Sequence, residues 1–396
     1  MREEKKYLRA GLVGSGFAAR FHYEALERVY GVNVEVVGVY SPTRKNREAF
    51  AAERGIRPFS SLDELIQATD VLHVCTPPVT HEPVAVQALR RDRSVIIEKP
   101  FTGYFGDGDP SFNGRTFSRS HGLEEAVASI KRMREAEAAG RGRILYAENW
   151  VYAPSIQKER EIIEKSGAHV LWLYGMEAHS GSHSPYYGIW SHSGGGSLMG
   201  KGVHPLTACL YLKRVEGRAR LGKPIRPLSA SARVHSITGS DQFRDLGHLK
   251  TGYTDVEDFA QLHVLFEDGT VADIFASELL LGGVRNNLEV VADNHRGVCS
   301  INPNTSFMTY TPDEQYLRDV YVVEKTETKQ GWAFTSPDED WFTGYQHEME
   351  AFYRSIASDT EPESDSQLAG DTIAVVYAGY CSAEQNGTEV AVPRIS

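Results

Sequence analysis

A glycine-rich turn near the start of the sequence has the spacing of a dinucleotide-binding loop. Residues 14–19 read GSGFAA, a GxGxxA pattern, and stand between an apolar run and a helical pattern. The first glycine suits a tight turn, the second lets the backbone approach a pyrophosphate, and the alanine allows close helix–strand packing. The helix N-terminus that follows favours an anion. The residues expected to contact NAD or NADP here are Gly14, Gly16, Phe17 and Ala18.

The end of the second expected strand, 34–40, leaves the choice between NAD and NADP open. The Asp or Glu that binds the ribose in NAD enzymes is not found near this point. Ser41 and Arg44 can hold a 2′-phosphate, as in NADP enzymes. Alternatively, Ser41 caps the next helix and Arg44 is a solvated helix residue.

A lysine stands where an open α/β sheet binds its ligands. Glu98-Lys99-Pro100 follows a strand expected over 94–97, and Thr76-Pro77-Pro78 with His81 ends the preceding strand at the same edge. A lysine there can hydrogen-bond a substrate hydroxyl and stabilise the alkoxide as hydride leaves. We therefore predict a catalytic role for Lys99, and further cofactor contacts from Thr76, Pro77, His81, Glu98 and Lys99.

A second group of polar side chains precedes a glycine run in the second half of the chain. Residues 177–187 read EAHSGSHSPYY and are followed by Trp190 and His192. Hydroxyls, imidazoles and aromatic faces suit a hydroxyl-rich ring. We expect a pocket wall there. A zinc site is disfavoured, because these histidines form no recognisable pair on a helix with a carboxylate. For any single histidine a structural role stays open. The substrate-binding candidates are Tyr152, His179, His183 and Trp190.

The elements that must position these residues fall into two halves. Through residue 100, strand-like and helical patterns alternate, which indicates βαβ units and a doubly wound parallel sheet of the Rossmann type. Later strand-like runs are separated by turns, which is typical of an α+β domain with a large open, mainly antiparallel sheet. We predict domains over 1–143 and 144–396. The expected later strands are 144–149, 170–177, 227–234, 260–266, 271–277, 287–292 and 321–324, and the expected helices are 155–165, 204–213, 344–358 and 371–386.

A long irregular segment interrupts the first half. Residues 102–120 are rich in Gly, Asp, Ser and Asn and contain four aromatic residues. Loops of this length inside domains are usually functional or disordered. The aromatic residues favour an ordered lid or a subunit contact.

The composition narrows the class of protein. The chain has 396 residues and a net charge of −11, which argues against nucleic-acid binding. Its four cysteines are far apart, which predicts buried thiols in a reducing compartment rather than disulfides. Neither a leader peptide nor a membrane-spanning run is recognisable, so we expect a cytoplasmic enzyme without membrane partners.

Taken together, these motifs resemble the Gfo/Idh/MocA oxidoreductases, the family of glucose-fructose oxidoreductase and inositol dehydrogenase. The resemblance rests on the three motifs above and on residues 194–204 (GGGSLMGKGVH), and it continues through 287–291 (NLEVV) into the last helical segment. It implies a Rossmann domain, an open-sheet second domain, NAD or NADP, a sugar or cyclitol substrate, and a homodimer or homotetramer.

The resemblance also implies a proton-handling pair, Lys99 and His204, with His204 as the general base. Members of the family usually carry an aspartate four residues before this histidine, where this chain has Gly200 followed by Lys201. The change removes a carboxylate that would orient substrate or base, and Lys201 adds positive charge to the pocket as a substrate-binding candidate. Alternatively, both residues merely open a helix.

Two enzymatic functions fit the resemblance. The first is NAD(P)-dependent oxidation of a ring secondary alcohol of a sugar or sugar derivative. The alternative is a redox-neutral, NAD-dependent glycoside hydrolase, as in related sulfoquinovosidases, in which transient oxidation at C3 is followed by elimination, water addition and re-reduction. In that case Lys201 or Arg115 would face an anionic group of the glycoside. A third function, a cofactor-binding sensor, is disfavoured by the intact Lys99 and His204.

Overall fold

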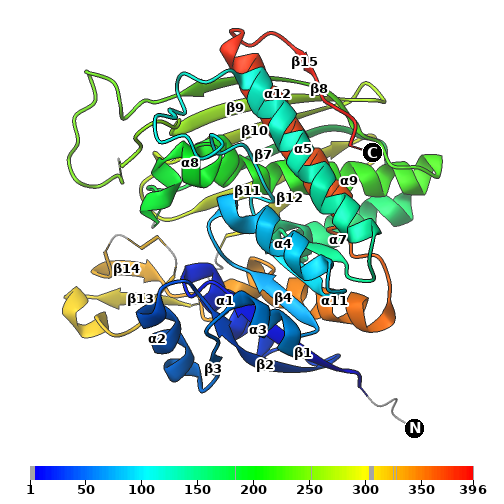
Figure 1. Cartoon of the computed structure of the whole chain (residues 1–396). Coiled ribbons are helices and arrows are strands. Elements are labelled where there is room, and N and C mark those ends of the chain that lie inside the picture. The colour runs from blue at the N-terminus through cyan, green and yellow to red at the C-terminus, as the bar shows by residue number, and fades with distance from the viewer. Residues whose placement is uncertain are drawn as a thin grey trace.

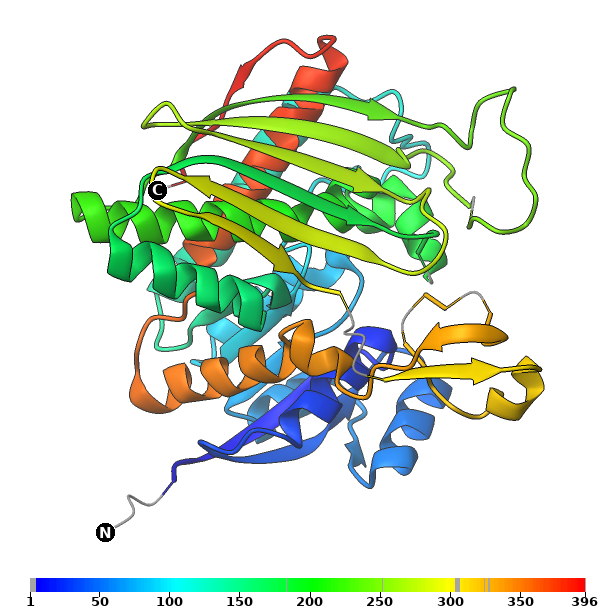
Figure 2. The ribbon, with the colours of Figure 1, turned by 180° about the vertical axis from the view of Figure 1, so that it is seen from behind.

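The chain forms two large sheets with helices packed between and around them (Figure 1). The computed structural model describes residues 5–182, 184–250, 252–302, 307–323, 325–326 and 328–395. The N-terminal sheet and the later sheet lie at opposite ends of the molecule, and the chain returns to both after residue 340 (Figures 1 and 2).

The first sheet has six parallel strands in the order β3-β2-β1-β4-β5-β6, the doubly wound arrangement that the sequence predicts. The two central strands next to the site, β4 and β5, are buried along their whole length, as strands covered by helices on both faces must be. The strands are β1 (Tyr7–Val13), β2 (Asn33–Tyr40), β3 (Arg57–Pro58), β4 (Val71–Val74), β5 (Ser94–Glu98) and β6 (Ile144–Ala147).

Helices connect these strands, and their ends follow from local sequence. Helix α3 begins at Leu62, directly after Ser61. The hydroxyl of Ser61 accepts a hydrogen bond from the amide of Glu64 at 3.2 Å. Helix α2 ends at Gly55, whose φ of 66° is the left-handed conformation that glycine adopts at helix ends. The connecting helices are α1 (Phe17–Leu26), α2 (Arg44–Arg54), α3 (Leu62–Ala68), η1 (Pro78–Thr80), α4 (His81–Leu89) and α5 (Arg119–Ala138).

The predicted boundary between 143 and 144 does not coincide with the edge of the first sheet. Strand β6 begins at Ile144 and pairs in parallel with β5, so it is the sixth strand of that sheet. Only after β6 does the chain cross to the second sheet, through α6 (Asn149–Tyr152) and α7 (Pro154–Ser166). The sequence pattern of a single apolar strand could not show which sheet it joins.

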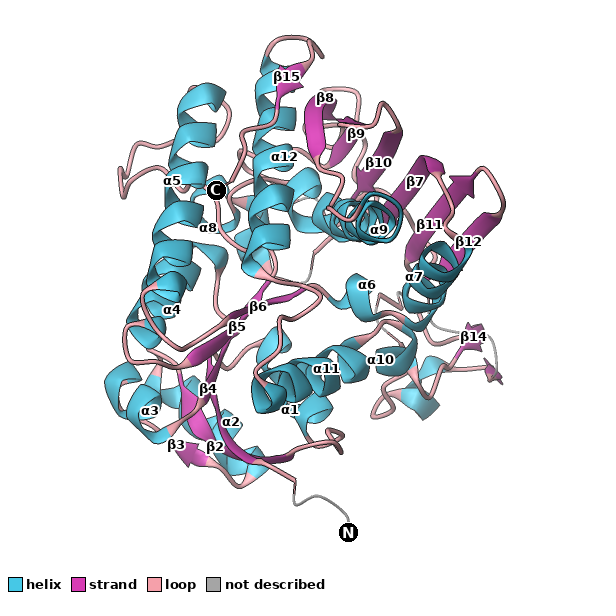
Figure 3. Cartoon of the chain, turned by 90° about the vertical axis from the view of Figure 1, so that its right-hand side faces the viewer, coloured by secondary structure: helices cyan, strands magenta, loops and turns pink. Residues whose placement is uncertain are grey.

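The second sheet has seven strands in the order β12-β11-β7-β10-β9-β8-β15. It is mainly antiparallel as predicted, with β7 and β10 as a parallel pair at its centre. Helices α9 and α12 pack against one of its faces (Figure 3). The strands are β7 (Val170–Ala178), β8 (Pro227–His235), β9 (Phe259–Phe266), β10 (Val271–Ser277), β11 (Arg285–Ala292), β12 (Arg296–Ser300) and β15 (Val390–Ala391).

The remaining helices tie the two sheets together. The last long helix packs against both α5 and β8, and it begins after Asp365, whose carboxylate accepts the amide of Leu368 at 2.7 Å. These helices are η2 (Pro185–Gly188), α8 (Trp190–Ser193), the π-helical turn η3 (Leu198–Gly202), α9 (Val203–Leu221), η4 (Glu314–Leu317), α10 (Glu339–Phe342), α11 (Tyr345–Ser358) and α12 (Ser366–Glu384).

One hydrophobic core runs through both halves. The same cluster of buried side chains contains Leu72 and Val95 of the first sheet and Leu262 and Val264 of the second. Tyr377 of α12 belongs to it as well. The two sheets are therefore packed on a shared core rather than joined by a linker.

The loop between β5 and α5 is ordered and lies against the second half of the same chain. The amide of Gly114 donates to Asp255 at 2.7 Å, and the indole of Trp190 donates to the carbonyl of Tyr104 at 3.0 Å. The guanidinium of Arg119 lies 4.3 Å from the centre of the Trp190 ring. The aromatic residues that suggested an ordered segment make this contact within the chain.

A short hairpin of β13 (Met308–Thr311) and β14 (Gly331–Phe334) projects beside the first sheet (Figure 2). The strand predicted over 321–324 does not form: residues 321–323 have no regular structure, and Glu324 lies outside the described residues. All four cysteines are free and buried, as predicted. Among the helices described, none is both long and apolar enough to cross a membrane.

Candidate active site

The glycine turn joins β1 to α1 with the geometry that a dinucleotide needs. Gly14 has a φ of 108°, and a Cβ there would stand 2.4 Å from the carbonyl oxygen of Cys75. Gly16 precedes α1 without a side-chain cap, and a Cβ there would meet nothing within 4 Å. The turn therefore leaves an uncapped helix N-terminus facing open space, which fits the pyrophosphate of a dinucleotide.

The neighbouring candidates surround this turn with different exposure. Phe17 is half exposed at the first position of α1. Ser41 is buried, and its carbonyl accepts a hydrogen bond from Arg47 at 3.0 Å. Arg44 is exposed and pairs with Glu48 at 2.7 Å. The helix after Ser41 is preceded by Thr43 and shows no side-chain cap, so Ser41 is not its N-cap. Contacts of Ser41 and Arg44 with the cofactor remain predictions.

His81 fixes the two loops that end β4 and β5. Its Nε2 lies 2.9 Å from the carbonyl oxygen of Thr76, and its Nδ1 lies 3.0 Å from that of Pro100. Burial lowers the pKa of His81, although these carbonyls oppose the shift. The ring therefore holds Thr76 and the Lys99-Pro100 segment in register, a positioning role beside its predicted cofactor contact.

Glu98 is the last member of a series of buried side chains that are linked by hydrogen bonds. Its Oε1 lies 2.9 Å from Nε2 of His22, whose Nδ1 lies 2.8 Å from Nδ1 of His73. The other nitrogen of His73 lies 2.8 Å from the hydroxyl of Tyr353. With both histidines neutral, every bond is satisfied if the protons point one way, from Tyr353 through the two rings to the carboxylate. The second carboxylate oxygen of Glu98 accepts the amide of Lys99 at 3.0 Å.

Lys99 reaches from the end of β5 to the turn before α9. Its Nζ donates to the carbonyl of Gly200 at 3.0 Å and lies 5.7 Å from the centre of the Tyr187 ring. Burial by itself lowers the pKa of Lys99, but Tyr187 and the surrounding carboxylates raise it, and the net pKa lies above the ordinary lysine value. Lys99 is therefore an ammonium group at neutral pH, a donor rather than a base.

His204 stands between two buried carboxylates. Its Nδ1 lies 2.5 Å from Oε1 of Glu148, and its Nε2 lies 3.8 Å from Oε2 of Glu177. The ring also stacks on Trp150, with centroids 6.0 Å apart. Burial lowers the pKa of His204 to about 3, an effect that Glu177 opposes and the Lys99 charge reinforces. His204 is thus a neutral imidazole with Nδ1 bound to Glu148 and Nε2 beside Glu177.

Burial raises the pKa of both carboxyl groups beside His204. Burial raises the pKa of Glu148 to about 8, against the opposing charge of Lys99. Burial also raises the pKa of Glu177, which His204, Lys201 and Lys99 partly offset. The site therefore contains groups that can exchange protons near neutral pH, next to one fixed ammonium.

Lys201 is buried and its charge is balanced. Its Nζ lies 3.4 Å from a carboxylate oxygen of Glu278 and 3.2 Å from the hydroxyl of Ser182. The other oxygen of Glu278 lies 3.6 Å from Nδ1 of His179. His179 and Lys201 thus lie beside the same carboxylate, and their contacts with a substrate stay a prediction. Gly200 and Lys201 lie within η3, directly before α9.

The structure does not bring every predicted residue to this cluster. The hydroxyl of Tyr152 accepts the amide of Ser364 at 3.1 Å within the core. Trp190 is buried against the loop before α5, where it contacts Tyr104 and Arg119. His183 lies outside the described residues.

Glu148 and Glu278 are absent from the sequence predictions, and Glu177 enters them only as the first residue of the wall expected over 177–187. Glu148 directly follows β6, at the same sheet edge as Lys99, and this position was the available signal. Glu177 ends β7, while Glu278 follows β10, the strand paired with β7. The sequence could not pair these two strands, so it could not place their carboxylates beside His204 and Lys201.

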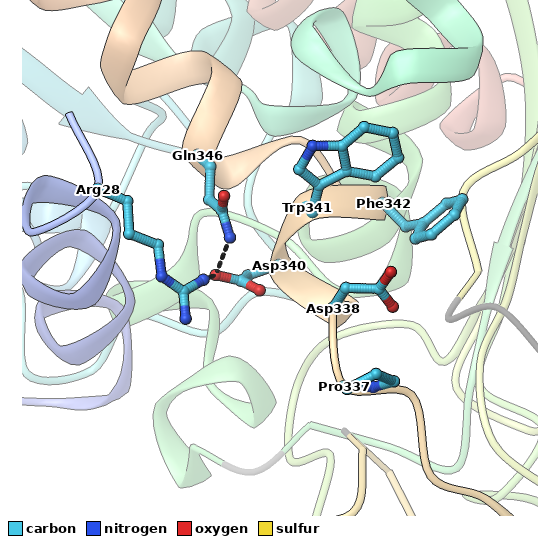
Figure 4. A pocket seen from close by; sticks show the side chains of 7 residues that line it. All are labelled: Arg28, Pro337, Asp338, Asp340, Trp341, Phe342 and Gln346. Atoms are coloured by element: carbon cyan, nitrogen blue, oxygen red, sulfur yellow. Dashed lines mark hydrogen bonds and ion pairs between the residues drawn. The ribbon is translucent and has the colours of Figure 1, made fainter. Parts of the chain in front are cut away.

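Two other features lie apart from this site. His169, Glu216 and Asp268 come close enough to share a metal, but Nζ of Lys213 already contacts the two carboxylates, at 2.5 Å and 2.9 Å. A surface hollow beside α10 contains the Arg28–Asp340 ion pair, with Gln346 donating to Asp340 at 2.7 Å (Figure 4). Neither includes a residue of the cluster around Lys99.

Comparison with known proteins shows which proteins the N-terminal part of the chain resembles. Residues 8–109 match the model of the Gfo/Idh/MocA family, described as an oxidoreductase family with an NAD-binding Rossmann fold. Glucose-6-phosphate 3-dehydrogenase of Bacillus subtilis is 40% identical over 90 residues, which cover 23% of this chain and 25% of that protein. UDP-N-acetylglucosamine 3-dehydrogenase of Acidithiobacillus ferrooxidans is 30% identical over 152 residues, 37% of this chain and 46% of that protein. The matched stretches thus span about a quarter and under half of these relatives.

Solved structures match the whole fold at low identity. GenD2 from gentamicin A biosynthesis, in complex with NAD, has a TM-score of 0.75 and 22% identity, covering 98% of this chain and 97% of that chain. Levoglucosan dehydrogenase, in complex with NADH and levoglucosan, has a TM-score of 0.71 and 17% identity, covering 98% and 100%. Residues 8–109 are therefore similar to the NAD-binding Rossmann domain of the Gfo/Idh/MocA oxidoreductases, and the chain as a whole has the fold of these solved structures.

Proposed function

We propose that this chain is an NAD-dependent oxidoreductase that oxidises a secondary alcohol of a sugar or sugar derivative. The observation that carries the proposal is the convergence of Lys99 and His204 at the carboxyl edge of the first sheet. Lys99 follows β5, and the glycine turn follows β1, two strands away in the same sheet. With strands about 4.8 Å apart, the two lie on the order of 10 Å from each other.

The charge states of Lys99 and His204 assign them different roles. Lys99 stays protonated, so its role is to donate to the substrate hydroxyl and to stabilise the developing alkoxide. His204 is neutral, and when Glu148 is ionised and accepts the Nδ1 proton, Nε2 is free to accept the hydroxyl proton. When bound, the nicotinamide ring supplies the acceptor for the hydride.

The wall around Lys201 favours a substrate recognised through hydroxyl groups. Its ammonium is paired with Glu278, and several further carboxylates face the same space. A site whose cations are already paired gains little from an anionic substrate, because each new charge must compete for a donor in use. A neutral sugar or cyclitol is the class that this balance fits best.

The glycosidase alternative is favoured by one observation, the additional acid–base groups Glu148 and Glu177. Elimination of an aglycone needs a general acid for the leaving group beyond the pair that handles the oxidised hydroxyl. Burial raises the pKa of Glu148 to about 8, so this carboxyl can hold a proton at neutral pH, and burial raises the pKa of Glu177 as well. The two functions differ in stoichiometry: the oxidoreductase forms one NADH per turnover, and the hydrolase releases aglycone without net NADH.

A single assay decides between them. The protein is incubated with NAD and D-glucose, D-glucose 6-phosphate, myo-inositol or levoglucosan, and separately with aryl glycosides and catalytic NAD. We expect NADH absorbance from at least one free sugar or cyclitol. Aglycone release without NADH would assign the hydrolase instead. Absence of both reactions would reject the enzymatic proposal.

Replacing Lys99 tests the role of the ammonium. Lys99→Ala should lower kcat by about 10²–10⁴-fold, the range of a lost proton-handling group, while NAD still binds. NADH formation measures the first effect, and NAD titration by calorimetry measures the second. Lys165→Ala serves as the control, because Lys165 is an exposed residue of α7 paired with Glu161. Retention of most activity by Lys99→Ala would refute the assignment.

A further inference from the structure

Glu177 has a buried carboxylate oxygen with nothing to bind. The side chain comes from the end of β7 and is 6% exposed. Its Oε2 has no hydrogen-bond partner among the described residues. A buried, unsatisfied carboxylate oxygen is costly, and such groups are rare unless a ligand completes them. The oxygen therefore calls for a donor that the chain itself does not provide.

The position of this oxygen says which donor fits. Oε2 of Glu177 lies 3.8 Å from Nε2 of His204, beyond hydrogen-bond length. The charges of both Lys99 and Lys201 act on the carboxylate, so Glu177 belongs to the same polar cluster as these lysines and His204. Two acceptor atoms this close can each accept a hydrogen bond from a different hydroxyl group of one small molecule. Adjacent hydroxyl groups of a sugar ring provide such a pair of oxygens.

We propose that Glu177 is a substrate-binding residue whose Oε2 accepts a hydrogen bond from the hydroxyl next to the one that His204 deprotonates, so that the site selects vicinal diols. The proposal rests on the oxidation of a sugar alcohol at Lys99 and His204, proposed above. Glu177 neither takes up nor releases a proton in this role. It holds the ring so that the reacting hydroxyl faces His204.

An open position beside Lys99 provides a way to restore the carboxylate. The carbonyl of Gly200 binds Nζ of Lys99, and a Cβ on Gly200 would meet only Tyr187 ring atoms, at 3.5 Å and 3.8 Å. These are ordinary van der Waals contacts, so a Cβ fits there without moving the backbone. An aspartate at position 200 would approach the same pocket from η3 instead of β7.

The test compares each sugar with its deoxy analogues. For D-glucose and D-glucose 6-phosphate, whichever yields NADH, kcat/KM is measured beside the 2-deoxy and 4-deoxy compounds in wild type and Glu177→Gln. A site that hydrogen-bonds a hydroxyl can reject the analogue lacking it by as much as about 10⁴-fold. We expect wild type to reject one of the two analogues by at least about 10²-fold, a threshold set below the roughly 10⁴-fold selectivity that such a site can reach. In Glu177→Gln that discrimination should fall to about tenfold or less.

Two further variants separate binding from folding. Glu177→Gln combined with Gly200→Asp should regain part of the lost discrimination, which a purely structural role of Glu177 would not produce. Glu159→Gln is the matched control, because Glu159 is also buried and also faces a histidine, His295, at 2.7 Å, outside the site. It should leave the discrimination unchanged. Thermal melting of each variant shows that the fold persists.

The outcomes distinguish the two proposals. Unchanged discrimination in Glu177→Gln, with wild type active, overturns the role of Glu177 and leaves the oxidation of a sugar alcohol intact. Equal turnover of diol and deoxy compounds by wild type has the same consequence. No NADH from any sugar in wild type overturns both. Binding of D-glucose and 2-deoxy-D-glucose to the NADH-loaded protein, measured by calorimetry, gives a readout that does not depend on turnover.

Discussion

At the scale of single residues, the site is defined by which nitrogen of His204 carries a proton. Glu148 holds Nδ1 at 2.5 Å, so its own ionisation controls the other nitrogen. When Glu148 is ionised it accepts the Nδ1 proton, and Nε2 is a free acceptor. When the pair takes up one more proton, it is held by Glu148 or by the ring, and Nε2 then carries a hydrogen. Only the first form can act as a base toward a substrate hydroxyl.

This coupling predicts a pH profile for the oxidation. Burial raises the pKa of Glu148 to about 8, so kcat/KM should rise with pH up to that value and level off above it. Below it the rate should fall about tenfold per pH unit, since one proton blocks the base. Lys99 stays charged across this range because its pKa is raised. The measurement is kcat/KM for NADH formation between pH 6 and pH 10.

Glu148→Gln tests whether Glu148 causes the rising limb of this profile, the increase of kcat/KM up to about pH 8. An amide cannot ionise, so the limb near pH 8 should disappear or move to the lower pKa of the His204 ring. Glu177 also faces the ring, and Glu177→Gln should keep the limb, because it leaves the Glu148–His204 bond in place. A limb that persists unchanged in Glu148→Gln would show that another group controls the base.

At the scale of elements, the two glycines of the turn between β1 and α1 are required for different reasons. A Cβ on Gly14 would collide with the backbone of Cys75, whereas a Cβ on Gly16 would face open space. Gly14→Ala should therefore lower the Tm, through a left-handed φ that costs roughly 1–2 kcal/mol for a non-glycine residue and through the clash. Gly16→Ala should keep the Tm of the unliganded protein but weaken NAD binding about tenfold or more.

Differential scanning fluorimetry without NAD and calorimetric titration with NAD separate these two effects. Gly108→Ala is a control of the same kind, since Gly108 has a φ of 76° with no neighbour within 4 Å and lies in the loop before α5. Its effect on Tm measures backbone strain alone. If Gly16→Ala bound NAD as tightly as wild type, the turn would not be the pyrophosphate site.

The same scale shows what the sequence can and cannot predict. The turn at 14–19 and Lys99 were predictable, because each is a local pattern at the end of its own strand. Glu177 and Glu278 were not, because they meet the site only through the parallel pairing of β7 with β10, about 100 residues apart in the chain. Tyr152 and Trp190 were placed in the pocket by their chemical type, yet packing directs them to Ser364 and Tyr104.

At the scale of the whole molecule, the C-terminal helices α11 and α12 pack against both halves, so the two sheets are not separate folding units. Helix α11 packs on α1, and α12 packs on both α5 and β8. One hydrophobic cluster includes strands of both sheets. A chain built in this way is expected to unfold as one unit, because exposing either sheet also exposes the core of the other.

The distribution of tryptophan makes this cooperativity measurable. All five tryptophans lie at or after residue 150, whereas NAD binds the Rossmann domain at residues 8–109. NAD at about 100 times its Kd should stabilise the folded chain by about 2.7 kcal/mol. If the molecule is one unit, the unfolding transition seen by tryptophan fluorescence should shift upward with NAD, even though all five tryptophans lie outside the matched residues. It should coincide with the transition seen by far-UV circular dichroism. A fluorescence transition unmoved by NAD, or two separated transitions, would mean that the second sheet unfolds independently of the cofactor domain.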